Sequence, residues 1–179
     1  MNAICAVQDF DAPLAPAIDA EAYRSVLGRF VTGVTVMTVA GEDGTRAGVT
    51  ANSFNTVSMD PPLILWSLAL TAPSLTLFRE NEHFAVNILA ADQRDVALRF
   101  ARPADDKFQG LATQAGATGA PLIEGALAHL ECRVAHRYPG GDHEIIVGEI
   151  VRMTGSDMQP LVFHGGRFCN VMSDELAAG

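Results

Sequence analysis

Residues 126–153, ALAHLECRVAHRYPGGDHEIIVGEIVRM, are the stretch that decides the fold class. Apolar and polar side chains alternate along Ala126–Tyr138, which is the period of two expected of a strand with one buried face. Glu144–Met153 has a second strand-like pattern, and the turn Pro139–His143 between them contains two glycines. The stretch therefore predicts two long strands that form an antiparallel hairpin.

Shorter strand-like runs precede and follow this hairpin. Val34–Val39 (VTVMTV) is β-branched and is followed by the turn Gly41–Gly44. Further strands are predicted at Arg46–Asn52, Phe54–Met59, Leu63–Leu68, Phe84–Leu89 and Leu161–His164. The links are mostly of hairpin length, and the regular crossover helices of a doubly wound parallel sheet are missing. The sequence predicts a mainly β domain with a few short helices, of Greek-key or barrel type.

Three short helices complete the prediction. Asp19 is a good N-cap for a helix that reaches about Phe30. Its apolar residues recur at three- and four-residue spacing, so we expect this face to pack inward: Tyr23, Val26, Leu27 and Phe30. Ser74 is expected to cap a helix at Ser74–Glu80, and Asp92 one that reaches about Phe100. Arg102–Ala120 is polar and aperiodic and is expected to be a loop.

Length and composition narrow the class of protein. The 179 residues are 49% hydrophobic and 18% charged, which fits one globular domain over 19–179 after a flexible leader at 1–18. We expect no membrane span, because the apolar runs are too short, and no secretory signal, which places the protein in the cytoplasm. Three widely spaced cysteines argue against a disulfide framework. A net charge of −9 argues against a nucleic-acid partner, and the histidine spacing argues against a metal.

Polar groups that could bind a ligand gather in three places. Thr50–Thr56 carries hydroxyl and amide side chains suited to a flat heteroaromatic ring, although composition alone favours a hydrogen-bonded bend between strands. Ser74 at a helix start suits a phosphate, with Arg94 and Arg102 nearby in sequence, or it is an ordinary cap. The turn 140–143 places His143 at a hairpin mouth, where it either contacts a ligand or is merely exposed. Dinucleotide-binding glycine motifs and hydrolase triads are absent from the sequence.

The order of several motifs resembles the short-chain flavin reductases, the reductase components of two-component flavin monooxygenases. The resemblance covers roughly residues 20–168. The motifs that carry it are GVTVMT (33–38), GVTANSFNTVSMDPPL (48–63), FAVNILAADQ (84–93), RFA (99–101), KFQG (107–110), GAPLIEGALAHLECR (119–133) and GGDHEIIVGEI (140–150).

This resemblance implies an FMN-binding split β-barrel that forms a homodimer. It also implies reduction of FMN or FAD by NADH or NADPH and release of the reduced flavin to a partner monooxygenase. The residues that it assigns to the flavin are Thr50, Ala51, Asn52, Ser53, Ser67, Leu68, Ser74, Ala85, Asn87, Arg94 and Phe100. The residues that it assigns to the nicotinamide are Gly141, Asp142 and His143.

The implied reaction explains why no catalytic acid or base is predicted, since hydride passes directly between the two cofactors. Two alternatives remain open at this point. The same barrel can hold flavin or haem without catalysis, because a fold does not fix a function. It can also belong to an oxidoreductase that keeps its flavin and reduces another acceptor.

Overall fold

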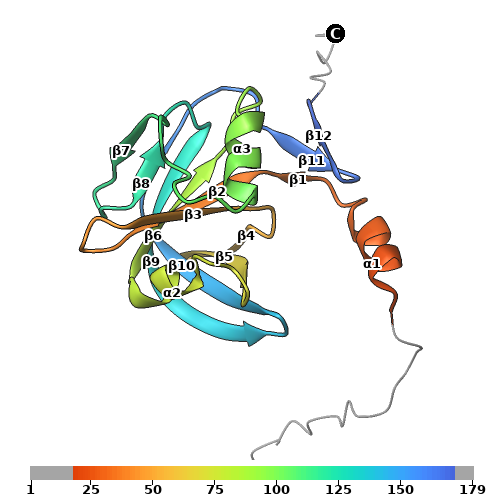
Figure 1. The fold of residues 1–179 in the computed structure, drawn as a ribbon, viewed down its shortest axis with the longest axis horizontal. Coiled ribbons are helices and arrows are strands. Elements are labelled where there is room, and N and C mark those ends of the chain that lie inside the picture. The colour runs from red at the N-terminus through yellow and green to blue at the C-terminus, as the bar shows by residue number, and fades with distance from the viewer. Residues whose placement is uncertain (1–17, 172–179) are drawn as a thin grey trace, which may run out of the picture.

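The structure is a computed structural model that describes residues 18–171. Its main feature is a seven-stranded sheet in which all neighbouring strands are antiparallel, in the order β3-β2-β6-β9-β10-β5-β4. The strands are β2 (Thr35–Ala40), β3 (Arg46–Ala51), β4 (Asn55–Met59), β5 (Pro62–Ala69), β6 (His83–Ile88), β9 (Ala128–Gly140) and β10 (His143–Gly155). The two edge strands, β3 and β4, follow one another in the chain, and the sheet curves around the core between them (Figure 1).

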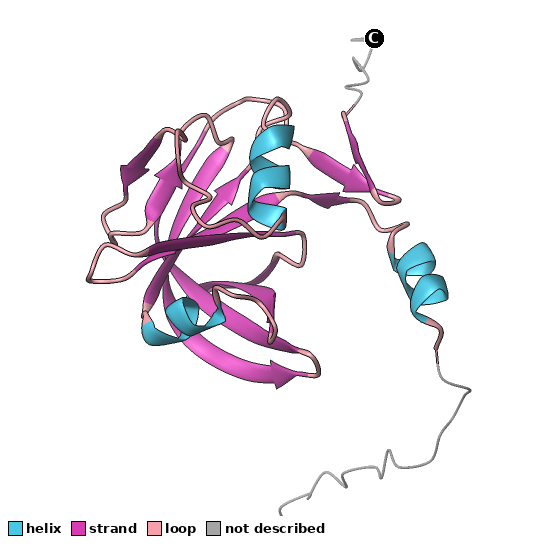
Figure 2. Ribbon diagram, viewed as in Figure 1, coloured by secondary structure: helices cyan, strands magenta, loops and turns pink. Residues whose placement is uncertain are grey.

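Two smaller sheets and the helices α2 and α3 lie around this barrel, and the helix α1 stands away from it (Figure 2). One small sheet combines β1 (Thr32–Gly33), β11 (Val162–His164) and β12 (Arg167–Cys169), and the other pairs β7 (Thr113–Ala115) with β8 (Pro121–Ile123). The helices are α1 (Ala20–Leu27), α2 (Leu75–Glu80) and α3 (Arg94–Ala101). Within residues 18–171, none of these helices has the length and apolarity needed to span a membrane.

The interior contains two apolar clusters. In the first, the fully buried ring of Trp66 on β5 lies 5.1 Å from the ring of Phe78 on α2 and 5.8 Å from that of Phe84 on β6. In the second, Phe100 of α3 packs edge-on against Phe108 at 5.0 Å. Offset and edge-on aromatic pairs of this kind add to the stabilisation from buried apolar area. The clusters fix α2 and α3 against the barrel, and both helices contribute to the site described below.

The predicted long hairpin is confirmed: β9 and β10 pair from Gly140–His143 at the tip to Ala128–Gly155 at the base. On its other side β10 pairs with β5, so that His143 lies opposite Ala69. This register places the tip of the hairpin beside the end of β5.

The structure corrects the prediction for the first helix. Asp19 caps α1 as expected, since its carboxylate accepts the N–H groups of Glu21 and Ala22, but the helix ends at Leu27. The prediction that its apolar face packs inward is wrong for the single chain, because α1 contains no buried residue and stands away from the barrel (Figure 1). The exposed apolar side chains are Tyr23, Val26, Leu27 and Phe30.

Three further local predictions need correction. Gln93, not Asp92, occupies the N-cap position of α3, and neither it nor Ser74 of α2 makes a side-chain capping hydrogen bond. The predicted loop Arg102–Ala120 contains strand β7. The predicted leader lies outside the described residues except for the exposed Ile18.

Candidate cofactor-binding site

A pocket of about 610 Å³ opens between β3, the start of α2 and the end of α3. Its volume lies in the range of cofactor pockets. The lining comes from three stretches of chain: Thr45–Val49, Thr71–Ser74 with Leu77, and Phe100–Asp105 with Lys107 and Phe108. Two residues assigned to the flavin by resemblance, Ser74 and Phe100, are therefore in the wall of this pocket.

The wall of this pocket is shaped by a glycine. At Gly48 a Cβ atom would lie 2.5 Å from the ring of Phe100, so a larger residue would force the ring away from β3. The close approach of ring and strand sets the position of the last turn of α3 and of the loop that follows it. Gly48 thus fixes one side of the pocket through packing.

Three cationic side chains line the same pocket. The Arg46 guanidinium lies 4.7 Å from the centre of the Phe108 ring, and Arg102 is exposed at the end of α3. Lys107 Nζ donates to the carbonyl oxygens of Phe100 at 2.9 Å and Gly48 at 3.3 Å. Partial burial lowers the pKa of Lys107 below its usual value. The cations give the pocket positive charge of the kind that binds an anionic group such as a phosphate. One carboxylate, Asp105, also lines the pocket.

The Thr50–Ser53 segment lies next to this wall and not in it. Thr50 Oγ1 donates to the carbonyl of Ala97 in α3 at 2.6 Å, and Ala51 packs on the first apolar cluster. Ser53 Oγ accepts from the N–H of Ser67 at 3.0 Å and lies 3.3 Å from its carbonyl oxygen. Asn52 is exposed. The segment therefore brings the end of β3 to β5 and unites Ser53 with Ser67.

Other residues assigned to the flavin lie in the core. Leu68 is 2% exposed, and Ala85 and Asn87 are fully buried on β6. The Asn87 amide donates to the Val36 carbonyl and to Thr38 Oγ1, and its oxygen accepts from the Ile123 N–H at 2.7 Å. These bonds join β2, β6 and β8, which is an architectural role for Asn87.

Arg94 is exposed at the start of α3. Its guanidinium lies 5.7 Å from the centre of the Phe168 ring, on β12. The side chain therefore points toward the small sheet that contains β11 and β12.

The residues assigned to the nicotinamide form the tip of the β9–β10 hairpin. Gly141 has a φ of +71°, a conformation that favours glycine in this turn. His143 Nδ1 donates to Asp142 Oδ1 at 2.7 Å, and this bond lowers the pKa of Asp142. The imidazole is 42% exposed and so is accessible to a ligand.

One short segment connects three of these features. It begins at Ser67, which meets Ser53, and passes through Ala69, which pairs with His143. The Leu70 N–H then donates to the Asp142 carbonyl at 3.0 Å, and the following residues 71–74 line the pocket. Residues 67–74 thus connect the Thr50–Ser53 segment, the tip of the β9–β10 hairpin and the pocket.

Sequence reasoning gave no role to several pocket residues. Arg46, Thr71 and Ala72 carried no signal of their own, because their place in the wall depends on how distant segments pack. Lys107 and Phe108 lay inside the quoted KFQG motif, but neither was assigned a role; the motif itself is the signal that could have pointed to them.

Known proteins show the same fold and sequence pattern. Over 150 residues the chain is 44% identical to an FMN reductase (NADH) of Agrobacterium fabrum, which covers 84% of this chain and 85% of the relative. It is 34% identical over 162 residues to the reductase subunit of a flavin-dependent monooxygenase of Rhodococcus jostii, covering 90% of this chain and 83% of that one.

A solved structure agrees with these relatives. An NADH:FAD oxidoreductase of Streptomyces globisporus, in complex with NAD and FAD fragments, matches with a TM-score of 0.83 and 40% identity over 90% of this chain and 99% of its own. The predicted split-barrel fold class is confirmed. The family model described as "Flavin reductase like domain" matches residues 27–172, and the chain belongs to this family of oxidoreductases.

Proposed function

We propose that the protein is an NADH-dependent flavin reductase that reduces FMN or FAD and supplies the reduced flavin to a partner monooxygenase. The family match and the names of the relatives support this proposal, and those names include both FMN and FAD as acceptors. Free thiols at Cys132 and Cys169 in the described chain are consistent with the reducing cytoplasm, the compartment that we propose.

The observation that carries the proposal is the convergence at residues 67–74. A flavin reductase must hold two ring systems face to face, about 3–3.5 Å apart, and it needs two binding surfaces in contact for this purpose. The pocket and the hairpin tip meet along this one segment through the Leu70–Asp142 hydrogen bond and the Ala69–His143 pair. This connection supports the proposal that His143 contacts a ligand that extends from the pocket along β5.

The two cofactors, when bound, supply the redox chemistry, a hydride transfer from nicotinamide C4 to flavin N5. The protein's residues therefore bind and orient. In this proposal Arg46, Arg102 and Lys107, which line the pocket, provide positive charge for the flavin phosphate. Ser53 and Ser67, which are hydrogen-bonded to each other, bind the ring portion. In the same proposal His143, hydrogen-bonded to Asp142, contacts the nicotinamide half of NADH.

We also propose that a second copy of the chain covers α1. The exposed fractions of Tyr23, Val26, Leu27 and Phe30 are 55%, 63%, 53% and 75%. An eight-residue helix is marginal in water without packing, and such an apolar face on a monomer marks an interaction surface. A homodimer explains both. Val26→Glu should shift the protein from dimer to monomer in sedimentation velocity, while Arg24→Glu on the same helix should not.

The oxidation of NADH with free FMN or FAD tests the activity directly. The absorbance of NADH should fall steadily in the presence of at least one of the two flavins. Oxidation should be faster with NADH than with NADPH at the same concentration. Absence of turnover with every pair of nucleotide and flavin would leave only a binding role. Co-elution of flavin with the protein after reduction would instead favour an enzyme that keeps its flavin.

Two substitutions test the placement of the cofactors. His143→Ala should raise the KM for NADH more than it changes the Kd for flavin, and Asn52→Ala should raise the Kd for flavin. Equal effects of His143→Ala on both ligands, or none, would remove His143 from the nicotinamide site. An unchanged Kd for flavin in Asn52→Ala would count against flavin binding by the Thr50–Ser53 segment.

A further inference from the structure

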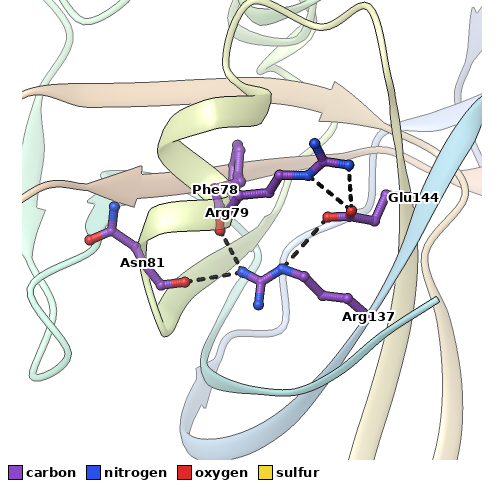
Figure 3. Close-up of polar contacts among 5 residues, drawn as sticks. All are labelled: Phe78, Arg79, Asn81, Arg137 and Glu144. Atoms are coloured by element: carbon purple, nitrogen blue, oxygen red, sulfur yellow. Dashed lines mark hydrogen bonds and ion pairs between the residues drawn. The ribbon is translucent and has the colours of Figure 1, made fainter. Parts of the chain in front are cut away.

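A cluster of charged side chains, Arg79, Arg137 and Glu144, joins α2 to the β9–β10 hairpin (Figure 3). Glu144, which is 9% exposed, accepts hydrogen bonds at Oε2 from Nε and Nη2 of Arg79, at 3.0 and 2.8 Å. Arg137 Nε lies 3.6 Å from the other carboxylate oxygen, Oε1. Removing one member of such a partly buried ionic cluster leaves charge without a partner, so its geometry is strongly constrained.

Arg137 ties this carboxylate to the end of α2. Its Nη2 donates to the carbonyl oxygens of Phe78 and Asn81, which lie at the end of the helix (Figure 3). Helix carbonyl groups in the last turn lack partners within the helix and carry partial negative charge, so a guanidinium stabilises them. Arg79 comes from the last turn of α2 itself. Both arginines thus join α2 to the β9–β10 hairpin.

The cluster contacts elements that belong to both candidate binding surfaces, the hairpin tip and the pocket wall. Successive side chains of a strand point to opposite faces, so Glu144 reaches toward α2 while the neighbouring His143 lies on the other face. The register agrees, because Glu144 pairs with buried Leu68 and His143 with Ala69. Ser74 at the start of α2 and Leu77 in the middle of the helix line the pocket. The hairpin tip and the pocket wall are therefore both attached to one short helix.

We propose that Glu144, Arg79 and Arg137 are positioning residues that fix His143 at a set distance from the flavin pocket. This inference rests on the proposed function, since it assumes that the nicotinamide meets His143. In this proposal the three residues act through the hairpin tip and do not touch the reacting atoms. They hold the hairpin tip against α2, and hydride transfer depends steeply on the distance between the two rings.

Glu144→Gln tests the proposal, because the amide keeps the shape of the side chain and removes its charge. We expect the KM for NADH to rise roughly tenfold and single-turnover flavin reduction to slow, since small displacements have large effects on transfer rates. The Kd for flavin should stay within about twofold, because the pocket residues are unchanged. Glu149→Gln is the matched control: it breaks the exposed Arg133–Glu149 pair of the same two strands and should leave the KM for NADH unchanged.

A double-substitution cycle separates positioning from general loosening. If Glu144 acts through His143, Glu144→Gln should have little further effect on the KM for NADH in a His143→Ala background. Additive effects, or a KM in Glu144→Gln equal to that of Glu149→Gln, would overturn the inference. Should Glu144→Gln fail to fold, Arg79→Gln takes its place under the same criteria, since the Arg79 side chain is 48% exposed. A normal KM for NADH in His143→Ala alone would instead overturn the proposed nicotinamide site.

Discussion

The barrel and α1 use apolar side chains in opposite ways. In the barrel Trp66, Phe84 and Val36 are between 0 and 1% exposed, and each contacts partners from the same chain. In α1 the apolar side chains are mostly exposed, although their three- and four-residue spacing is as regular as in any buried helix. Periodicity thus indicates which face will be covered and leaves open whether the cover comes from the same chain. The two regions should therefore respond differently to substitution.

The largest effect is expected where the barrel has no free space. A Cβ atom at Gly148 would lie 2.5 Å from the Phe84 ring, so Gly148→Ala should lower the free energy of unfolding by about 3 kcal/mol. Gly33→Ala is the control in β1, where nothing lies within 4 Å of the new methyl group, and should change stability by less than about 0.5 kcal/mol. Urea denaturation measures both. Equal changes would contradict the contrast between the barrel and its N-terminal extension.

A smaller loss is expected for the buried amide of the barrel. Asn87→Ala leaves the Ile123 N–H without its acceptor, and an unsatisfied buried group should lower the free energy of unfolding by about 2 kcal/mol. With an architectural role, the Kd for flavin measured by fluorescence quenching should stay nearly constant. A large rise in that Kd with unchanged stability would show that Asn87 contacts flavin after all.

The smallest effect is expected at the start of α1. Asp19→Ala removes the acceptor of the Glu21 and Ala22 N–H groups, which should destabilise the helix by about 1 kcal/mol. Hydrogen exchange should accelerate in α1 and stay unchanged in β6. Parallel acceleration in β6 would mean that the helix and the barrel unfold together.

The strands of the barrel were predictable because their patterns are local. The ranges predicted for β2, β3, β5, β6, β9 and β10 agree with the structure within two residues at each end. The three-residue strands β7 and β8 were not predicted, because they are too short to show a period, although β11, equally short, was predicted at Leu161–His164. Contacts with distant residues stabilise β8 instead, namely the hydrogen bonds of Thr38 to the Pro121 carbonyl and of Asn87 to the Ile123 N–H.

The site was less predictable because its parts are distant in the chain. The Thr50–Ser53 cluster and His143 were found as local concentrations of polar groups, and their use by the cofactors stays a prediction. The pocket wall combines Gly48, Ser74 and Phe100, which meet only after the barrel has formed. A side chain in one of the quoted family-like motifs can also point into the core, as Asn87 does. The alternation of side chains along a strand separates those that face the site from those that face the core only when the register of the strand is known.

The two edge strands of the main sheet, β3 and β4, leave a seam in the barrel wall that no ladder of backbone hydrogen bonds closes. The short link through Asn52 and Ser53 crosses this seam, and the hydrogen bonds between Ser53 and Ser67 connect its two sides. A cofactor that lies along the seam would contact both β3 and β4 and hold these two strands together. Because a ligand that binds only the folded state stabilises it, occupancy would protect β3 and β4 before the rest of the barrel.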